Sequence, residues 1–305
     1  MFNNFVYFLV KIPLKNMPQM NPSTLLQIIS LWASRVCLLV FVTIISIIAY
    51  VVLFRILPSE YSSCYNVPYF IFRVFLGVYI FYSIIFHYYK CRTLQPVKNP
   101  GTARDKFCIP CDNWKGPATS HCAACGRCIY RLDHHCPHIG QCVGAHNQSH
   151  FFLFLFHLLV GTASLFVLAP TFWLEWIELR DAVEKIPSDQ CWKPYCFNRL
   201  LYMVVVSHGK NDNMVKLSFF FSVVIHCIMW GFICCYAFMI SFGITFAMKL
   251  FGKSDVHSRK PLNWLTLQYR WKKYMNCQEQ PIWKVFLIPM SRRIVEYDEY
   301  QEIIM

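Results

Sequence analysis

The segment RLDHHCPHIGQCVG, residues 131–144, places three histidines and two cysteines within fourteen positions. Two Cys-x-x-Cys pairs precede it, together with Cys128 and His121. A Cys-x-x-Cys pair lets a single turn present both thiolates to one ion, as in a zinc ribbon, so two pairs with interleaved histidines predict zinc binding. The candidate ligands are seven cysteines and four histidines: Cys108, Cys111, Cys122, Cys125, Cys128, Cys136, Cys142, His121, His134, His135 and His138.

These eleven candidates exceed the eight ligands that two closed tetrahedral zinc sites require. Spacing alone does not identify the side chains that remain. Cys136 follows His134 and Asp133, which together supply a nucleophile, a base and a group to orient the base. A free thiol has a pKa of about 8.5, and nearby zinc, histidine and basic residues would lower it. The alternative is that Cys136 is a redundant thiol in a purely structural module, and the residue pattern leaves both interpretations open.

The loop that carries these residues is short of apolar side chains and contains several Gly and Pro turns. It is therefore unable to form a hydrophobic core of its own. We expect bound metal to supply its folding free energy.

The rest of the chain is strongly apolar: 56% of its residues are hydrophobic and 15% are charged, against about 25% charged in soluble domains. Four apolar stretches reach the roughly 20 residues that a membrane-spanning helix needs. The predicted fold class is an all-α polytopic membrane protein, with four transmembrane helices and a cytosolic zinc-binding, cysteine-rich loop domain between helices 2 and 3. The expected segments are a cytosolic N-terminal segment at 1–35, transmembrane helices at 36–57, 67–89, 151–174 and 217–248, the cysteine-rich domain at 90–150, a lumenal loop at 175–214 and a cytosolic tail at 249–305.

Lysine and arginine are concentrated on one side of these spans. Segment 1–35 has three basic residues and no acidic ones, segment 90–150 has eight against three, and segment 249–305 has ten against six. On the other side, 58–66 has no basic residue and 175–214 has five against six acidic ones. The positive-inside rule therefore places both termini and the cysteine-rich domain in the cytosol. Because the net charge of +13 is spread along the membrane flanks, it favours contact with anionic membrane lipids and argues against nucleic-acid binding.

The cysteine-rich segment resembles the DHHC-type (zinc-finger DHHC domain) protein S-acyltransferases, or palmitoyltransferases, which attach fatty acids to protein cysteines. The resemblance covers residues 108–152 and the four-span arrangement. It implies two structural zinc ions, one bound by Cys108, Cys111, His121 and Cys128, and the other by Cys122, Cys125, His135 and Cys142. It leaves Asp133, His134 and Cys136 as the catalytic residues.

The resemblance also implies acyl transfer in two steps. His134, oriented by Asp133, takes the proton of Cys136, and the thiolate attacks the thioester of a long-chain acyl-CoA such as palmitoyl-CoA. The acyl-enzyme then passes the chain to a cysteine of a protein substrate. The expected partners are acyl-CoA, membrane lipids and cytosolic or membrane proteins with juxtamembrane cysteines, and the expected location is the endoplasmic reticulum or the Golgi.

Several positions depart from the family pattern. His138 replaces the usual Trp, and Gln141 replaces the usual Asn. The Thr-Thr-x-Glu motif is not recognisable in LFGKSDVHSRK, residues 250–260. These departures leave room for an enzyme that is slow, specialised or dependent on an accessory subunit.

The C-terminal tail carries part of a further family motif. Tyr269 and Asn276 fit its aromatic and Asn positions, but Lys272 replaces its glycine. The segment 264–274 is amphipathic, which is consistent either with a membrane-surface helix or with packing on the zinc module.

Two other functional classes compete with an enzyme. A non-catalytic membrane-anchored zinc scaffold or adaptor fits the departures, but it has no need of a cysteine outside both zinc sites. A metal-ion transporter needs ligands at membrane depth, where the sequence places lone histidines such as His157 and His226.

One face of the third span combines Phe154, Leu158 and Gly161, which are four and three residues apart. This face either lines a cavity for the acyl chain or, through Gly161, allows close packing of two helices.

Overall fold

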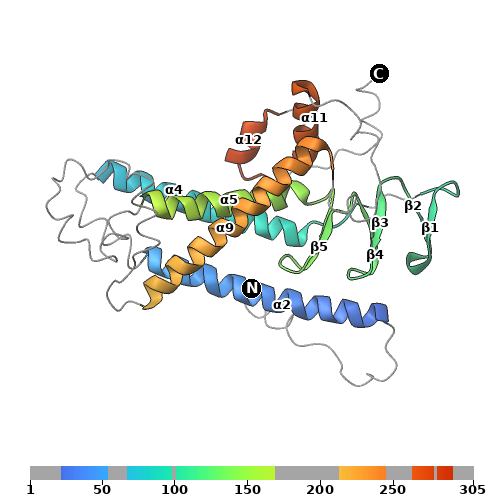
Figure 1. Cartoon of the computed structure of the whole chain (residues 1–305), viewed down its shortest axis with the longest axis horizontal. Coiled ribbons are helices and arrows are strands. Elements are labelled where there is room, and N and C mark those ends of the chain that lie inside the picture. Colours follow the sequence, from blue (N-terminus) through green and yellow to red (C-terminus); the bar gives the residue numbers. More distant parts are fainter. Residues whose placement is uncertain are drawn as a thin grey trace. The chain divides into compact units, whose positions relative to one another are not determined.

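The computed structural model describes residues 22–53, 67–97, 101–168, 213–244, 263–277 and 280–290. Within these residues, four helices are long and apolar enough to cross a membrane, as an integral multi-pass membrane protein requires (Figure 1). They are α2 (Pro22–Val51), α4 (Val67–Thr93), α5 (Gln148–Leu168) and α9 (Asn213–Phe242). The cysteine-rich region lies between α4 and α5, so the predicted fold class is confirmed. Most of the expected lumenal loop and segment 250–260 lie outside the described residues.

Helix α2 begins well before the apolar run that the sequence analysis assigned to the first span. Pro22 stands in the first turn, where a missing N–H costs nothing. Arg35 lies within this helix, and its guanidinium is 5.1 Å from the ring centroid of Trp32 on the same helix. The candidate membrane segment of this helix is Thr24–Val51.

Helix α9 ends in a hydrogen-bonded glycine cap. Gly243 adopts a φ of +68°, its N–H donates to Ile240 O at 3.1 Å, and Ile244 N–H donates to Met239 O at 2.9 Å. This 6→1 and 5→2 pattern is a Schellman motif. The helix therefore stops at Phe242, before the end of the apolar run that the sequence shows.

The cysteine-rich region forms three two-stranded antiparallel hairpins, which follow one another in chain order (Figure 1). No strands were expected in this loop from its sequence. The strands are β1 (Lys106–Cys108) paired with β2 (Asn113–Lys115), β3 (Thr119–Cys122) with β4 (Arg127–Tyr130), and β5 (His134–Cys136) with β6 (Gln141–Val143), and the 3-10 helix η3 (Ile109–Cys111) follows β1. The pairing places His121 opposite Cys128 and His135 opposite Cys142.

The chain divides into two compact units. The first contains Met1–Phe41, Tyr88–Phe151 and Ala237–Met305, and so includes the zinc module and the tail helices α11 (Trp264–Met275) and α12 (Ile282–Leu287). The zinc module of this unit has a small hydrophobic cluster of Cys122, Ile129 and Cys142. A core of this size fits the expectation that metal supplies much of the folding free energy.

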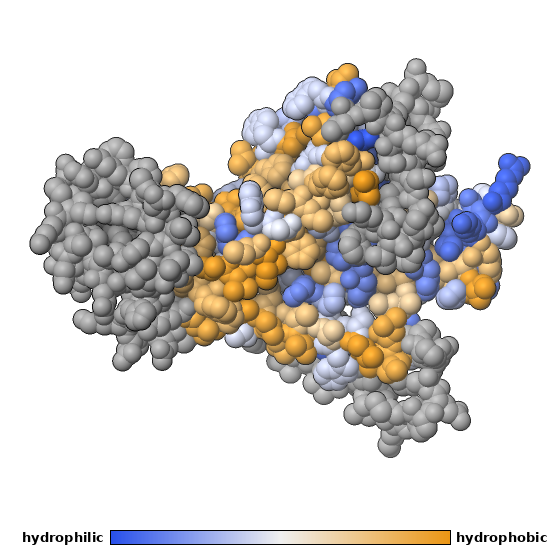
Figure 2. All heavy atoms as spheres, viewed as in Figure 1, coloured by the Kyte–Doolittle hydropathy of each residue, from blue (hydrophilic) through white to orange (hydrophobic). Residues whose placement is uncertain are grey.

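The second unit contains Val42–His87 and Phe152–Tyr236. Its outward helix faces carry apolar side chains such as Phe75 and Val78, which are 70% and 62% exposed, and Figure 2 shows the hydrophobic colouring over the helices. A Cβ on Gly161 would lie 3.1 Å from Ile80 Cγ2 and 3.6 Å from Ile84 Cδ1. This contact supports close packing of α4 and α5 at Gly161 over the cavity alternative.

Candidate metal centres and catalytic residues

The first ligand cluster joins the first two hairpins. Cys108, Cys111, His121 and Cys128 offer ligand atoms that all lie within 4.8 Å of one another. His121 Nδ1 is 3.2 Å from Cys111 Sγ and 3.5 Å from Cys108 Sγ. The β1 end and the η3 turn present the first two thiols, and the β3–β4 register brings Cys128 beside His121.

The second cluster joins the second and third hairpins. Its members are Cys122, Cys125, His135 and Cys142, and their ligand atoms again lie within 4.8 Å of one another. His135 Nδ1 is 3.2 Å from Cys125 Sγ and 3.7 Å from Cys142 Sγ, and the two sulfurs are 3.3 Å apart. Both clusters use the ligand atoms that belong to them under the family resemblance.

Both clusters have the chemistry of a structural zinc site. Each combines three thiol sulfurs with one imidazole nitrogen, the ligand types that tetrahedral zinc prefers. Four ligands placed about 2.0–2.3 Å from an ion are roughly 3.5 Å apart in a tetrahedron. The observed separations, which run from 3.2 to 4.0 Å, fit that arrangement.

Cys136 belongs to neither cluster. Successive side chains of a strand point to opposite faces, so in β5 His135 faces one way while His134 and Cys136 face the other. His135 lies in the second metal cluster. The strand therefore separates one metal ligand from a histidine–cysteine pair although the three residues are consecutive.

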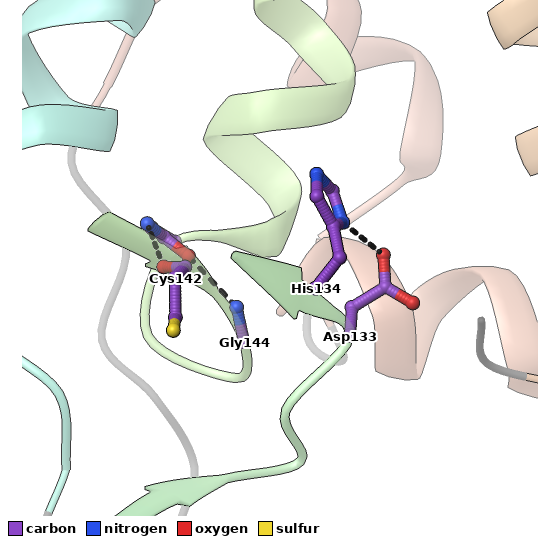
Figure 3. Close-up of polar contacts among 5 residues, drawn as sticks. Asp133, His134, Cys142 and Gly144 are labelled. Carbon is purple, nitrogen blue, oxygen red and sulfur yellow. Dashed lines mark hydrogen bonds and ion pairs between the residues drawn. The ribbon is translucent and has the colours of Figure 1, made fainter. Parts of the chain in front are cut away.

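His134 is held by an ionic hydrogen bond and by an aromatic contact. Its Nδ1 lies 3.1 Å from Oδ2 of Asp133, which is buried (Figure 3). The Phe151 ring meets the imidazole edge-on at a centroid distance of 5.4 Å. With Nδ1 bound to the carboxylate, the other ring nitrogen is left to exchange a proton with a thiol.

His134 and Cys136 shift each other's pKa values. Burial alone would lower the pKa of His134, but its hydrogen bonds to Asp133 and Cys136 outweigh burial and raise that pKa to about 9. Burial alone would raise the pKa of Cys136, but hydrogen bonds from His134 and from the backbone N–H groups of Ile139 and His138 lower it. The two shifts favour a thiolate next to an imidazolium.

The turn that follows Cys136 is fixed by side chains from the end of α4. Tyr88 Oη donates to the carbonyl oxygen of His138 at 3.0 Å, and Arg92 Nη1 donates to the same oxygen at 3.4 Å. His138 thus contributes its backbone carbonyl to this contact, and a different side chain at this position leaves the contact available. Within the turn, Gly140 N–H donates to Cys136 O at 3.0 Å.

Two amide side chains, Gln141 of β6 and Asn147 just before α5, bind backbone carbonyls at or just after the end of α4. Gln141 Nε2 donates to Cys91 O and, at 3.3 Å, to Leu94 O. Asn147 Nδ2 donates to Cys91 O and to Cys142 O, both at 3.1 Å, while its Oδ1 accepts from Gly144 N–H at 3.0 Å. Because the last carbonyls of a helix lack intrahelical partners, these amides satisfy them. Gln141 therefore has a defined role here, although the family usually has Asn at this position.

The tail helix α11 packs on the zinc module, which is one of the two alternatives for this segment. Asn276 ends the helix with a φ of +52°, and its Nδ2 donates to Ala145 O at 3.3 Å. Gln148 Nε2 donates to Tyr274 O at 3.0 Å. The hydroxyl oxygen of Tyr274 is buried, and burial together with nearby Asp133 raises the pKa of this hydroxyl well above its usual value.

Four residues of this site escaped the sequence analysis: Tyr88, Arg92, Gln148 and Tyr274. Each makes a hydrogen bond with a partner that is 46 or more residues away in the chain, Gln148 and Tyr274 with each other. The sequence gave a signal for only two of them, because Gln148 follows Asn147 and Tyr274 lies two residues before Asn276, both of which are family motif positions.

Comparison with known proteins agrees with this geometry. Residues 101–252 match the model of the DHHC palmitoyltransferase family. The chain is 25% identical to palmitoyltransferase ZDHHC16A of Danio rerio over 198 residues, 64% of this chain and 51% of that protein. It is 40% identical to palmitoyltransferase ZDHHC18 of Mus musculus over 80 residues, 26% of this chain and 21% of that protein. It is 42% identical to protein S-acyltransferase 8 of Arabidopsis thaliana over 64 residues, 21% of this chain and 16% of that protein.

The matched regions thus span about half or less of the length of these relatives. The family match at 101–252 includes the cysteine-rich module, in which the two ligand clusters and the Asp133–His134–Cys136 segment lie. The chain belongs to the DHHC palmitoyltransferase family.

Proposed function

We propose that this protein is a protein S-acyltransferase. It moves a long-chain acyl group, such as palmitoyl, from acyl-CoA to cysteines of protein substrates through an acyl-enzyme at Cys136. The observation that carries the proposal is the position of Cys136, outside both ligand clusters and beside a histidine held by Asp133. Family membership supports the reaction class, and this position supports Cys136 as the nucleophile.

The first step forms the acyl-enzyme. His134 holds the proton of Cys136, and the thiolate attacks the carbonyl carbon of the acyl-CoA thioester. The bond between that carbon and the CoA sulfur breaks, and the CoA thiolate takes the proton from His134. The N–H groups of Ile139 and His138, which donate to the sulfur of Cys136, hold the thiolate in place before attack.

In the second step, Cys136 is the leaving group and a substrate cysteine is the nucleophile. A substrate cysteine gives its proton to His134 and attacks the acyl-Cys136 thioester. Cys136 leaves as a thiolate and is free for the next acyl-CoA. Each step exchanges one thioester for another, so positioning and a lowered thiol pKa contribute more than a large driving force.

Two zinc ions would be held by Cys108, Cys111, His121 and Cys128, and by Cys122, Cys125, His135 and Cys142. When bound, zinc supplies structural cross-links between hairpins and no open coordination position for chemistry. The residues of this chain that act on substrate are then Asp133, His134 and Cys136.

The membrane arrangement follows from charge and from the helices. The basic residues of 1–35, 90–150 and 249–305 support cytosolic termini and a cytosolic zinc module. Protein substrates with juxtamembrane cysteines would meet Cys136 close to the first turn of α5, which begins at Gln148. An endoplasmic reticulum or Golgi location fits this topology, and an accessory subunit fits the divergence of the tail.

A non-catalytic zinc scaffold is less well supported, because it gives no reason for the Asp133–His134 hydrogen bond or for the depressed pKa of Cys136. Incubation of the purified protein with a clickable palmitoyl-CoA distinguishes the two. We expect a hydroxylamine-sensitive label on wild type that is absent from Cys136→Ser, with the zinc content unchanged. The matched control is Cys142→Ser, which should lose zinc. An unlabelled wild type that contains two zinc ions would favour the scaffold.

A further inference from the structure

His135 uses its two ring nitrogens for different partners. Nδ1 lies among the thiols of the second ligand cluster, 3.2 Å from Cys125 Sγ. Nε2 lies 2.7 Å from the hydroxyl oxygen of Ser30, which belongs to α2 and is 105 residues away in the chain. A nitrogen that ligates a metal carries no proton, so Nε2 bears the proton and donates it to Ser30 Oγ.

This contact is part of a row of polar side chains along α2. Gln27, Ser30 and Ser34 are three and four residues apart, so they share one helix face. The row occurs on a helix whose neighbouring apolar side chains are largely exposed, whereas Ser34 is buried. Polar side chains on a membrane helix normally face protein, and here the facing protein is the zinc module.

Two glycines of the module make room for this row. Gly126 has a φ of +63°, and a Cβ there would lie 2.7 Å from Gln27 Nε2. Gly140 has a φ of +67°, and a Cβ there would overlap Ser34 Oγ. The backbone at Gly140 therefore approaches the short Ser34 side chain more closely than a residue with a Cβ allows, and the positive φ of both turns favours glycine. The Ser30–His135 hydrogen bond lies between these two close approaches in the α2 sequence.

The first cluster differs in this respect. Among the described residues, no side chain makes a hydrogen bond with the second ring nitrogen of His121, although its Nδ1 occupies the same position relative to its thiols. The two clusters thus have the same ligand set but differ in what holds the histidine.

We propose that Ser30 is a positioning residue for the second zinc centre, so that α2 controls how firmly Cys122, Cys125, His135 and Cys142 retain zinc. The inference rests on the proposed occupancy of the clusters by zinc. Acceptors that bind the second nitrogen of a ligating histidine fix its ring orientation and its basicity, and their loss typically weakens metal binding by about 10- to 100-fold. His135 also lies between His134 and Cys136 in β5, so the same contact fixes the strand that carries the catalytic pair.

The test measures zinc release from the full-length protein in detergent after addition of a colorimetric chelator. It compares wild type with Ser30→Ala, Ser30→Thr and Ser46→Ala, the last being the same substitution at an exposed position of α2. A pulse of a thiol-alkylating reagent, followed by peptide mapping, identifies which cysteines become free. We expect Ser30→Ala to release one of its two zinc ions at least about tenfold faster, with alkylation of Cys122, Cys125 and Cys142 but not of Cys108, Cys111 and Cys128. Ser30→Thr and Ser46→Ala should behave as wild type.

Each other outcome has a definite meaning. Wild-type protein without zinc would contradict the proposed occupancy itself. Wild type with two zinc ions and unchanged release from Ser30→Ala would overturn the role of Ser30 alone. Equal acceleration at both centres, or a Ser30→Thr variant that behaves as Ser30→Ala, would also overturn it, because the effect would then not depend on the hydroxyl or on the second centre.

Discussion

Asp133 and His134 are consecutive in the chain, yet their side chains are hydrogen-bonded, with Nδ1 and Oδ2 3.1 Å apart. The contact forms where the chain enters β5, and the Asp133 N–H donates to Val143 O at 2.9 Å on the partner strand. The carboxylate is thereby fixed by the hairpin and fixes the imidazole in turn. A buried acid in this position selects the tautomer and stabilises the imidazolium.

The first prediction concerns that carboxylate. Asp133→Asn keeps the shape of the side chain but removes the charge that raises the pKa of His134. We expect acyl-enzyme formation to slow by between about 100-fold and 10,000-fold, with two zinc ions still bound. The measurement is the single-turnover rate of labelling by clickable palmitoyl-CoA, with zinc content as the control. A rate within twofold of wild type would contradict the role of Asp133.

The second prediction concerns zinc removal. Two of the three buried side chains in the hydrophobic cluster of the module are ligand cysteines, so it should lose its hairpins without metal. After exhaustive chelation, we expect fast hydrogen exchange at residues 106–143 and retained helical circular dichroism. Zinc-loaded Cys136→Ser is the matched control and should stay protected. Slow exchange in the metal-free module would show that the hairpins do not depend on zinc.

The third prediction concerns Gln141. Its amide donates to the carbonyl oxygens of Cys91 and Leu94 from a site that is 5% exposed, so Gln141→Leu removes two hydrogen bonds at the end of α4. We expect a loss of about 1–3 kcal/mol in the free energy of unfolding. Thermal unfolding in detergent provides the measurement, and Gln95→Leu at an exposed position near the end of α4 is the control. Equal unfolding temperatures for the two variants would remove Gln141 from this role.

The fourth prediction concerns pH. Burial, assisted by the charge of Arg127, lowers the pKa of His146 to about 4. A histidine has a pKa of about 6.5 in the unfolded chain, so the unfolded state binds more protons between pH 4 and 6.5. The contribution of His146 to stability is therefore complete above about pH 6.5 and is lost as the pH falls towards 4. The expected loss is roughly 1 kcal/mol at pH 5.5.

His146→Gln isolates this contribution from acid-induced loss of zinc, which affects both proteins. We expect the unfolding midpoint of wild type to fall further between pH 7.5 and pH 5.5 than that of His146→Gln. Identical shifts in the two proteins would show that His146 does not titrate in this way.

The sequence predicted the four helices and the metal-binding character of the loop, because long apolar runs and Cys-x-x-Cys spacing are local signals. The ends of helices were harder to predict from the sequence. Helix α9 stops at a Schellman motif on Gly243, although the apolar run continues. The hydrogen-bond partners of Gln141 and His138 could not be predicted from the sequence, because they depend on how the end of α4 meets the third hairpin. The Ser30–His135 contact spans 105 residues, and the spacing of Gln27, Ser30 and Ser34 within α2 indicates a shared polar face but not the partner that this face meets.

The alternation of side chains along β5 limits how the hairpin can change in evolution. A ligand at His135 and a reactive pair at His134 and Cys136 occupy alternate positions of one three-residue strand. Insertion or deletion of one residue between Asp133 and Cys136 would exchange the two faces. The thiol would then enter the metal cluster and the ligand would leave it, so one change in length would abolish both properties together. Substitutions in the turn at 137–140, by contrast, do not change which face of β5 each residue occupies. The replacement at His138 is a substitution of this kind.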